Sequence, residues 1–248
     1  MSERITRNGR TLAYNHTPGT GPGVVFLGGF ASDMQGTKAL ALEAWAGGAG
    51  RAFLRLDYSG HGDSEGAFTD GCIGDWFADA LAVIEGVTTG PQILVGSSMG
   101  GWISLLIARE RPDLVAGLVT IAAAPDFTED GMWPSFSDAQ RQQIMTDGQI
   151  SVPSDYGDPY VITRRLIEDG RDRLVLRSPL PLPFPVRMVQ GTADTAVSTA
   201  TALRLLEHAD GPDIRLTLVR GADHRFSEPD EIALIERSVD EVLHRLRA

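Results

Sequence analysis

Residues 93–106 read ILVGSSMGGWISLL, an apolar run followed by a glycine-flanked turn and then a helical pattern. Its centre, Gly96–Gly100, fits the sequence G-x-S-x-G, in which a serine lies in a strained turn between a strand and a helix. A Cβ at either glycine would crowd the strand or helix that closes around the turn. The motif therefore predicts that the Ser98 hydroxyl lies at the carboxyl end of a strand, beside the positive end of the following helix.

Apolar runs and amphipathic helical patterns alternate on both sides of this turn. Val24–Leu27 is a continuous apolar run, typical of a strand buried on both faces, and further strands are expected at Ala52–Leu56 and Leu118–Ile121. Residues 73–84 place apolar side chains at the spacing of one helix face. The alternation predicts an α/β fold with a mostly parallel central sheet and helices on both faces.

The ends of the chain complete the predicted sheet. Two short antiparallel strands are expected to open the fold, joined by a tight turn at Asn8–Gly9. After residue 185, the pattern predicts the strands Val186–Gln190 and Ile214–Val219. The helix between them is expected to point Leu203 and Leu206 inward, and an amphipathic helix closes the chain.

The regular alternation stops after residue 126, where we expect a small helical cap over the carboxyl edge of the sheet. Ser137–Gln140 has the pattern of a capping box that opens one helix, and Asp158–Pro159 that of the first residues of another. Residues 146–157 between them are polar and rich in turn formers. The expected domains are the α/β core, residues 1–126 and 180–248, and the cap insertion, residues 127–179.

Three polar residues follow predicted strands at their carboxyl ends: Ser98, Asp194 and His224. Nucleophile, acid and base occur in this chain order in one class of serine enzymes. The chemistry needs a hydroxyl that attacks, a neutral imidazole that takes its proton, and a carboxylate that orients the imidazole. We therefore predict a catalytic triad of these residues, with Asp126, which also follows a strand, as the alternative acid.

Backbone donors for a developing oxyanion are expected on two loops. Gly28–Phe30 follows an early strand, and Met99 follows the predicted nucleophile. In this type of site, one N–H comes from each of these positions. We predict that the oxyanion hole consists of the N–H groups of Phe30 and Met99, each contributing about 3 to 4 kcal/mol in the transition state.

Large side chains near the turn and in the cap are candidates for an acyl pocket, although ordinary packing explains them equally well. The candidates are Trp102, Trp133, Phe136 and Met145. Arginines in the cap offer a second candidate site, for an anionic group, but acidic residues alternate with them and favour a solvated surface. These arginines are Arg164, Arg165, Arg171, Arg173 and Arg177.

Composition limits the partners. The formal net charge of -11 argues against nucleic acid or an anionic membrane surface. Cys72 is the only cysteine, which excludes intramolecular disulfides and cysteine-based metal clusters. We expect no cofactor and no metal ion. Residues 1–10 lack the apolar core of a secretory signal, and no apolar run reaches the roughly 18 residues of a membrane span, so we expect a cytoplasmic protein without membrane insertion.

Local matches identify the chain as similar to the α/β-hydrolase superfamily over essentially its full length. It most closely resembles a branch described as mitochondrial palmitoyl-protein thioesterases and acyl-glucuronide esterases. The resemblance implies Ser98 as nucleophile, Asp194 as acid and His224 as base. Unlike that branch, the chain shows no Arg- and Ser-rich leader, so we expect a bacterial cytoplasmic relative. The matching stretches are Gly36–Leu40, Asp57–Gly60 and Gly90–Trp102.

The expected function is that of a serine hydrolase, which cleaves carboxylic esters or thioesters through an acyl-serine intermediate. Its substrate is a small molecule or an acylated protein, and the sequence leaves the oligomeric state open. An amino-terminal peptidase is an alternative, with Glu129 and Asp130 as candidates to hold a free amine. The others are a perhydrolase or acyltransferase, and a ligand-binding receptor of the same fold without turnover.

Overall fold

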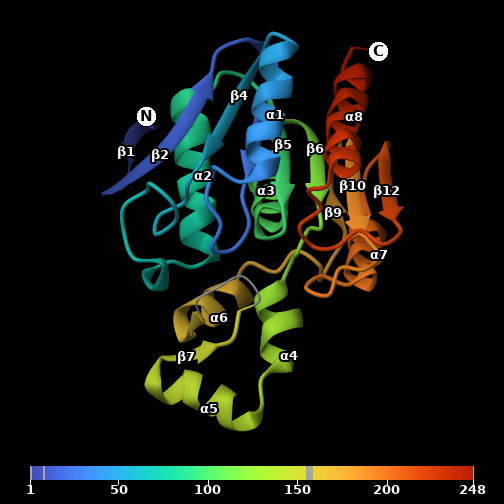
Figure 1. Ribbon diagram of the computed structural model, residues 1–248. Helices are drawn as coiled ribbons and strands as arrows, with labels where there is room; N and C mark the ends of the chain where they lie inside the picture. The colour runs from blue at the N-terminus through green and yellow to red at the C-terminus, as the bar shows by residue number, and fades with distance from the viewer. Residues whose placement is uncertain (1, 8, 155–158, 248) are drawn as a thin grey trace.

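The computed structural model describes residues 2–7, 9–154 and 159–247. Within them, eight strands form one sheet in the order β1-β2-β4-β3-β5-β6-β10-β12. The pairs β1–β2 and β2–β4 are antiparallel and all other neighbours are parallel, so the predicted fold class is confirmed (Figure 1). The strands are β1 (Glu3–Arg7), β2 (Arg10–Thr17), β3 (Thr20–Leu27), β4 (Arg51–Leu56), β5 (Gln92–Ser97), β6 (Val115–Ile121), β10 (Val186–Gly191) and β12 (Ile214–Val219).

Helices cover both faces of this sheet. Helices α1 and α8 contact each other on one face, and α2 and α3 pack together on the other, which α7 also covers (Figure 1). Along β5, Ile93 and Val95 belong to the first of these two cores and Leu94 to the second, because successive side chains of a strand point to opposite faces. The helices are α1 (Thr37–Gly48), α2 (Ile73–Val87), α3 (Met99–Glu110), α7 (Thr199–His208) and α8 (Pro229–Arg245).

One detail of the core differs from the sequence prediction. Helix α7 buries Ala202 and Leu205, whereas Leu203 is 46% exposed, so the prediction of an inward Leu203 is wrong. Helix α7 begins after its N-cap Ser198, and this start turns Ala202 and Leu205, three positions apart, toward the sheet.

The predicted hairpin turn includes Asn8, which lies outside the described residues. In the described part of the chain, no helix has the length and apolar character needed to cross a membrane.

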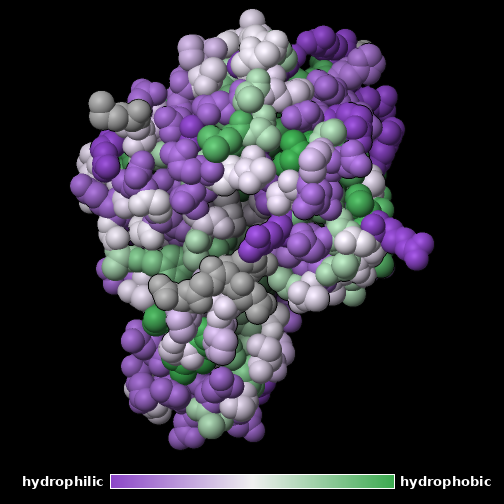
Figure 2. All heavy atoms as spheres, viewed as in Figure 1, coloured by the Kyte–Doolittle hydropathy of each residue, from purple (hydrophilic) through white to green (hydrophobic). Residues whose placement is uncertain are grey.

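Residues 128–154 and 159–171 form a lobe at the carboxyl end of the strands. Figures 1 and 2 show it protruding below the sheet, with hydrophilic and hydrophobic residues intermixed on the visible face. The capping box predicted at its helix α5 is confirmed, because Ser137 accepts from the Gln140 backbone and Gln140 accepts from that of Ser137. The lobe contains η3 (Thr128–Met132), α4 (Trp133–Ser135), α5 (Asp138–Asp147), β7 (Gln149–Val152), β8 (Tyr160–Thr163) and α6 (Arg164–Arg171).

The second helix of the lobe begins later than predicted. Asp158, the expected N-cap, lies outside the described residues, and Tyr160–Thr163 form strand β8 instead of a helix. This strand pairs antiparallel with β7, which lies within the stretch expected to be only turns, and the buried Ile150 and Ile162 are partners in the register. The β-branched residues in both stretches explain the pairing. Thr163 then caps α6 by accepting from the Leu166 N–H.

The chain returns from the lobe to the sheet through a short parallel pairing. Strand β9 (Leu180–Pro181) pairs with β11 (Ala209–Asp210), which follows α7. Two single 3₁₀ turns, η1 (Phe68–Asp70) and η2 (Pro112–Leu114), complete the described secondary structure. Strands β3, β5, β10 and β12 run parallel in the sheet, so the connections that follow them lie at one edge. Ligands bind at this edge in open α/β sheets.

Candidate active site

Ser98 lies in the predicted turn between β5 and α3. Its backbone has φ 54° and ψ -117°, in a sparsely populated region that a surrounding structure must enforce. A Cβ on Gly96 would lie 2.4 Å from the Gly100 carbonyl oxygen, and a Cβ on Gly100 would lie 2.0 Å from the Leu27 carbonyl oxygen. Both glycines are thus required for the close approach of β5, α3 and β3 that presents the Ser98 hydroxyl.

Two loops from the other half of the sheet bring His224 and Asp194 to this serine. His224 follows β12, and its Nε2 lies 3.1 Å from Ser98 Oγ. Its Nδ1 lies 2.8 Å from Oδ2 of Asp194, which follows β10. The loops are joined by a hydrogen bond from the Ala193 N–H to the Ala222 carbonyl. The structure therefore brings the three residues of the predicted triad together in a hydrogen-bonded chain.

Asp194 is the buried end of this chain, with a side chain that is 0% exposed. Its Oδ1 accepts from the backbone N–H groups of Ala196 and Val197, and its Oδ2 accepts from His224 and from the Gln190 amide. Burial by itself raises the pKa of Asp194, but these hydrogen bonds outweigh it and hold the pKa below its usual value. Asp194 is therefore ionised at neutral pH and orients the His224 ring with Nδ1 as the donor.

The backbone beside Ser98 comes from the two loops expected to carry oxyanion donors. A Cβ on Gly29 would lie 3.4 Å from the Ser98 Cβ, so the chain entering Phe30 passes directly beside the hydroxyl. Met99 is the first residue of α3, where a backbone N–H has no partner within its own helix. The positive end of the helix dipole points toward the same place.

Two cavities meet at Ser98 and His224. One has a volume of about 270 Å³ and a partly polar lining, which includes Ser32, Asp33 and Lys38. The other has a volume of about 340 Å³ and a mainly apolar lining, contributed by Ala124, Phe127, Met132, Val197 and neighbouring residues. Phe30 and Tyr160 line both cavities, and their rings pack edge-to-face with centroids 5.4 Å apart.

The side chains expected to form an acyl pocket lie elsewhere in the described structure. Trp102 is fully buried, donates its indole N–H to the Arg173 carbonyl and packs its ring against Phe127, so it supports the apolar cavity from behind. Phe136 is buried in the apolar core that the lobe shares with the sheet, and Trp133 and Met145 are partly buried against it. The apolar spacing of a helix does not tell whether its side chains pack in a core or line a cavity. The residues that line neither cavity are Trp102, Trp133, Phe136 and Met145.

Phe127, Met132 and Tyr160 are the lining residues that the sequence analysis missed. Phe127 and Met132 lie in the turn η3 and just before it, and Tyr160 begins β8. The position of Phe127 on the connection after the carboxyl end of β6 is a sequence signal that points to the site. The position of Tyr160 depends on the pairing of β7 with β8, which the polar composition around it obscured.

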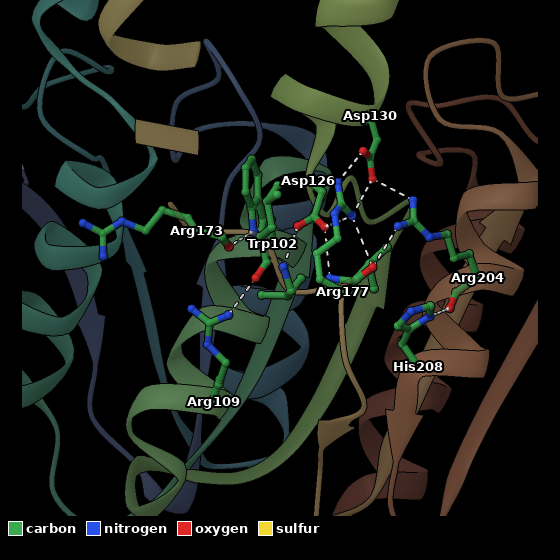
Figure 3. A network of polar contacts seen from close by, with 11 residues as sticks. Trp102, Arg109, Asp126, Asp130, Arg173, Arg177, Arg204 and His208 are labelled. Carbon is green, nitrogen blue, oxygen red and sulfur yellow. Dashed lines mark hydrogen bonds and ion pairs between the residues drawn. The ribbon is translucent and has the colours of Figure 1, made fainter. Parts of the chain in front are cut away.

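Asp126, the alternative acid, does not contact His224 in the described structure. Its buried carboxylate accepts from the backbone N–H groups of Val175 and Leu176 and pairs with Arg177 (Figure 3). Burial raises the pKa of Asp126, and these donors oppose the rise. The residue therefore fastens the segment returning from the lobe to the end of β6.

The carboxylates considered for a free amine are both in ion pairs. Asp130 lies between Arg177 and Arg204, as Figure 3 shows, and Glu129 pairs with Arg171. Although partial burial raises the pKa of Asp130, hydrogen bonds from the two arginines hold it below its usual value. Both side chains therefore connect parts of the protein and do not point into either cavity.

The remaining cap arginines are also paired, as expected for a surface role. Arg164 pairs with Glu168, Arg165 with Asp75, and Arg173 with Asp169.

Cys72 is buried and precedes helix α2. Burial raises the pKa of the Cys72 thiol to about 12, so it remains protonated at the N-terminus of α2. Among the described residues, no three or more His, Cys, Asp or Glu side chains are grouped to hold a metal ion. Among the described residues at this edge of the sheet, the candidate reactive groups are those of the hydrogen-bonded chain Ser98–His224–Asp194.

Comparison with known proteins agrees with this geometry. Residues 22–155 match the family described as serine aminopeptidase, S33. Over 238 residues, covering 95% of this chain and 80% of the relative, the sequence is 35% identical to palmitoyl-protein thioesterase ABHD10, mitochondrial, of Rattus norvegicus. The chain belongs to this family of α/β-hydrolases. This result confirms the resemblance inferred from the sequence motifs.

Solved structures place this α/β-hydrolase beside enzymes of the same fold. A putative hydrolase from Agrobacterium vitis S4 has a TM-score of 0.91 and 40% identity, covering 98% of this chain and 97% of that one. Alpha/beta hydrolase domain-containing protein 10 from mouse also has a TM-score of 0.91, with 33% identity and 99% coverage of both chains. The rat relative is a thioesterase by name, and this α/β-hydrolase is a hydrolase of the ester-bond class. A cytoplasmic location stays a prediction, since the ABHD10 relatives are described as mitochondrial.

Proposed function

We propose that this α/β-hydrolase cleaves carboxylic esters or thioesters through an acyl intermediate on Ser98. The observation that carries the proposal is the hydrogen-bonded chain from Ser98 through His224 to Asp194 at the meeting point of two cavities. The names of the relatives, which are thioesterases, support the reaction class. The substrate is a small-molecule ester or thioester, or an acylated protein.

The proposed reaction proceeds in two halves. Ser98 Oγ attacks the carbonyl carbon while its proton passes to His224 Nε2, and the resulting oxyanion accepts from the N–H groups of Phe30 and Met99. The C–O or C–S bond then breaks, and His224 returns the proton to the leaving alcohol or thiol. Water attacks the acyl group with its proton going to His224, and the carboxylic acid leaves as Ser98 regains its proton.

The linings of the cavities suggest which part of the substrate each one holds. The cavity beside Phe127 and Met132 is mainly apolar, which suits an acyl group, because burying apolar surface is favourable and needs no partner groups. The cavity that contains Ser32, Asp33 and Lys38 offers polar groups and suits the alcohol or thiol side. Ser98 lies at the junction, so the scissile bond is placed between the two.

Peptidase activity is the alternative that the family description favours. An amino-terminal peptidase needs a carboxylate that holds the free amine of its substrate. Glu129 and Asp130, the candidates for this role, are already paired with arginines and line neither cavity. This pairing favours an esterase or thioesterase over a peptidase.

A fluorophosphonate tests the proposed nucleophile. We expect the intact mass of the wild-type protein to increase by one adduct and the adduct to map to the peptide that contains Ser98, because His224 Nε2 lies 3.1 Å from its hydroxyl. Hydrolysis of p-nitrophenyl butyrate and of butyryl thioesters, compared with aminoacyl p-nitroanilides, then separates the esterase from the peptidase. A folded protein that stays unlabelled contradicts the proposal and favours a binding role, and turnover of anilides alone favours the peptidase.

The apolar cavity predicts how the enzyme selects acyl length. Met132→Trp fills part of this cavity and should lower the rate ratio of p-nitrophenyl octanoate to acetate by about tenfold, in the range that a methylene-sized change in an apolar pocket produces. The control is Met145→Trp, because Met145 is also a partly buried methionine of the lobe but lines neither cavity. Equal ratios in all three proteins would place the acyl group elsewhere.

A further inference from the structure

Gln190, the next-to-last residue of β10, has its side-chain amide inside the loop that carries Asp194. The residue is 1% exposed. Its Nε2 lies 3.0 Å from Asp194 Oδ2, 3.0 Å from the Val197 carbonyl oxygen and 3.1 Å from the Gly191 carbonyl oxygen. The loop of residues 191–197 is therefore wrapped around one amide nitrogen, and one of its contacts is the oxygen that also accepts from His224.

The orientation of this amide is fixed by its surroundings. All the polar atoms around Nε2 are acceptors, since two are carbonyl oxygens and one belongs to a carboxylate held ionised. Turning the amide over would place the Gln190 oxygen against these three oxygens and remove every hydrogen bond that they receive from it. The nitrogen must therefore face Asp194.

The same orientation leaves the other end of the amide without a protein partner. Gln190 Oε1 is buried and accepts no hydrogen bond from the described residues. A buried acceptor in that state is destabilising, and an apolar side chain of similar size would avoid the cost. Buried polar groups of this kind in native proteins call for an explanation other than packing. The contact with the carboxylate supplies one.

We propose that Gln190 is a positioning residue of the active site, which holds Asp194 Oδ2 in place for His224 and shares the negative charge of that oxygen. The inference rests on the proposed function of the triad. Gln190 touches neither Ser98 nor the cavities in the described structure, so it acts through Asp194. It completes four hydrogen bonds to this carboxylate, two on each oxygen.

Removing the amide should alter the hydrogen bond between Asp194 and His224. Without the Gln190 donor, Oδ2 keeps more of its negative charge and stabilises the protonated imidazole more strongly, while the carboxylate loses one of its restraints. The acidic limb of a rate–pH profile should then move to higher pH. The downfield N–H proton resonance of the His224 ring should shift and broaden.

The experiment compares Gln190→Met, which removes the amide, with Gln190→Asn, which retains an amide but withdraws it from the carboxylate. In both, we expect labelling by the fluorophosphonate at neutral pH to be about tenfold slower and its acidic limb to move up by about half a unit. The second variant carries the test if the first does not fold. The His224 N–H resonance is read by NMR in the same proteins and does not depend on turnover.

Gln92 provides a matched control on β5. It is also a buried glutamine, and its Nε2 donates to the Thr89 and Gly90 carbonyls at the opposite end of the sheet, with no carboxylate involved. Gln92→Met should leave the acidic limb and the His224 resonance unchanged. Folded Gln190 variants with a wild-type resonance and limb overturn the proposal. An unlabelled wild type would instead refute the proposed nucleophile, while a resonance that changes only in the Gln190 variants would still support the positioning role.

Discussion

Ser98→Ala should lower kcat for p-nitrophenyl butyrate by about 10⁵- to 10⁶-fold, the loss seen when a triad nucleophile is removed. The physical reason is that no other hydroxyl of the site lies beside His224 Nε2 in the described structure, so the acyl intermediate cannot form. Single-turnover and steady-state rates measure the effect. The backbone at this position, with φ 54°, accepts alanine as readily as serine, and thermal unfolding should change little.

Ser104→Ala is the matched control for this loss. Ser104 is a fully buried serine of α3, the helix that follows Ser98, and its hydroxyl donates to the Gly100 carbonyl at 2.7 Å. Its replacement should cost about 1 kcal/mol of stability and leave kcat within a factor of two. If the two variants lost activity to the same extent, the effect would be one of folding and the assignment of Ser98 would fail.

The second large effect is expected for Asp194→Asn, with kcat/KM about 10⁴-fold lower. The substitution keeps the shape of the side chain but replaces the ionised acceptor that fixes the His224 ring with Nδ1 as donor. The imidazole then turns or adopts the other tautomer, and Ser98 loses its base. Rates measured from pH 6 to 9 show whether the loss persists where the imidazole is neutral.

The control lies on the loop that carries His224. Asp223 accepts from the backbone N–H groups of Arg225 and Phe226 and is exposed. Asp223→Asn removes a negative charge near the same histidine without touching its Nδ1, and should change kcat/KM less than tenfold. A comparable loss in both variants would mean that the negative charge near His224 matters more than its hydrogen bond to Asp194.

Sequence reasoning selected Ser98, Asp194 and His224, which the structure brings together, because these residues follow signals that do not depend on long-range packing. The turn at Ser98 is set by Gly96 and Gly100, whose missing side chains make room for neighbouring backbone. Asp194 and His224 come directly after β10 and β12, and parallel strands in one sheet end at the same edge. Local composition and strand order were therefore enough.

The lining of the proposed acyl cavity could not be predicted in the same way. Met132 and Tyr160 belong to a lobe whose buried residues continue the apolar core between α2, α3 and the sheet, and Trp133 and Met145 satisfy the same apolar pattern. Which of these side chains faces Ser98 is decided by how the lobe is attached to the sheet. That attachment depends on pairs such as Asp130 with Arg204, which are 74 residues apart in the chain.

Asp126 joins the two segments that connect the lobe to the sheet, so sequence changes in the lobe and in the sheet should have different effects. The Asp126 carboxylate, on the connection that follows β6, accepts from the backbone N–H groups of Val175 and Leu176. The segment that leaves the sheet for the lobe is therefore hydrogen-bonded to the segment that returns from it. We expect changes within residues 128–154 and 159–171 to alter the cavity lining that the lobe contributes and to leave β10 and β12 in place. We therefore expect the proposed substrate range to respond to changes in the lobe, and the hydrogen-bonded arrangement of Ser98, Asp194 and His224 to be independent of them.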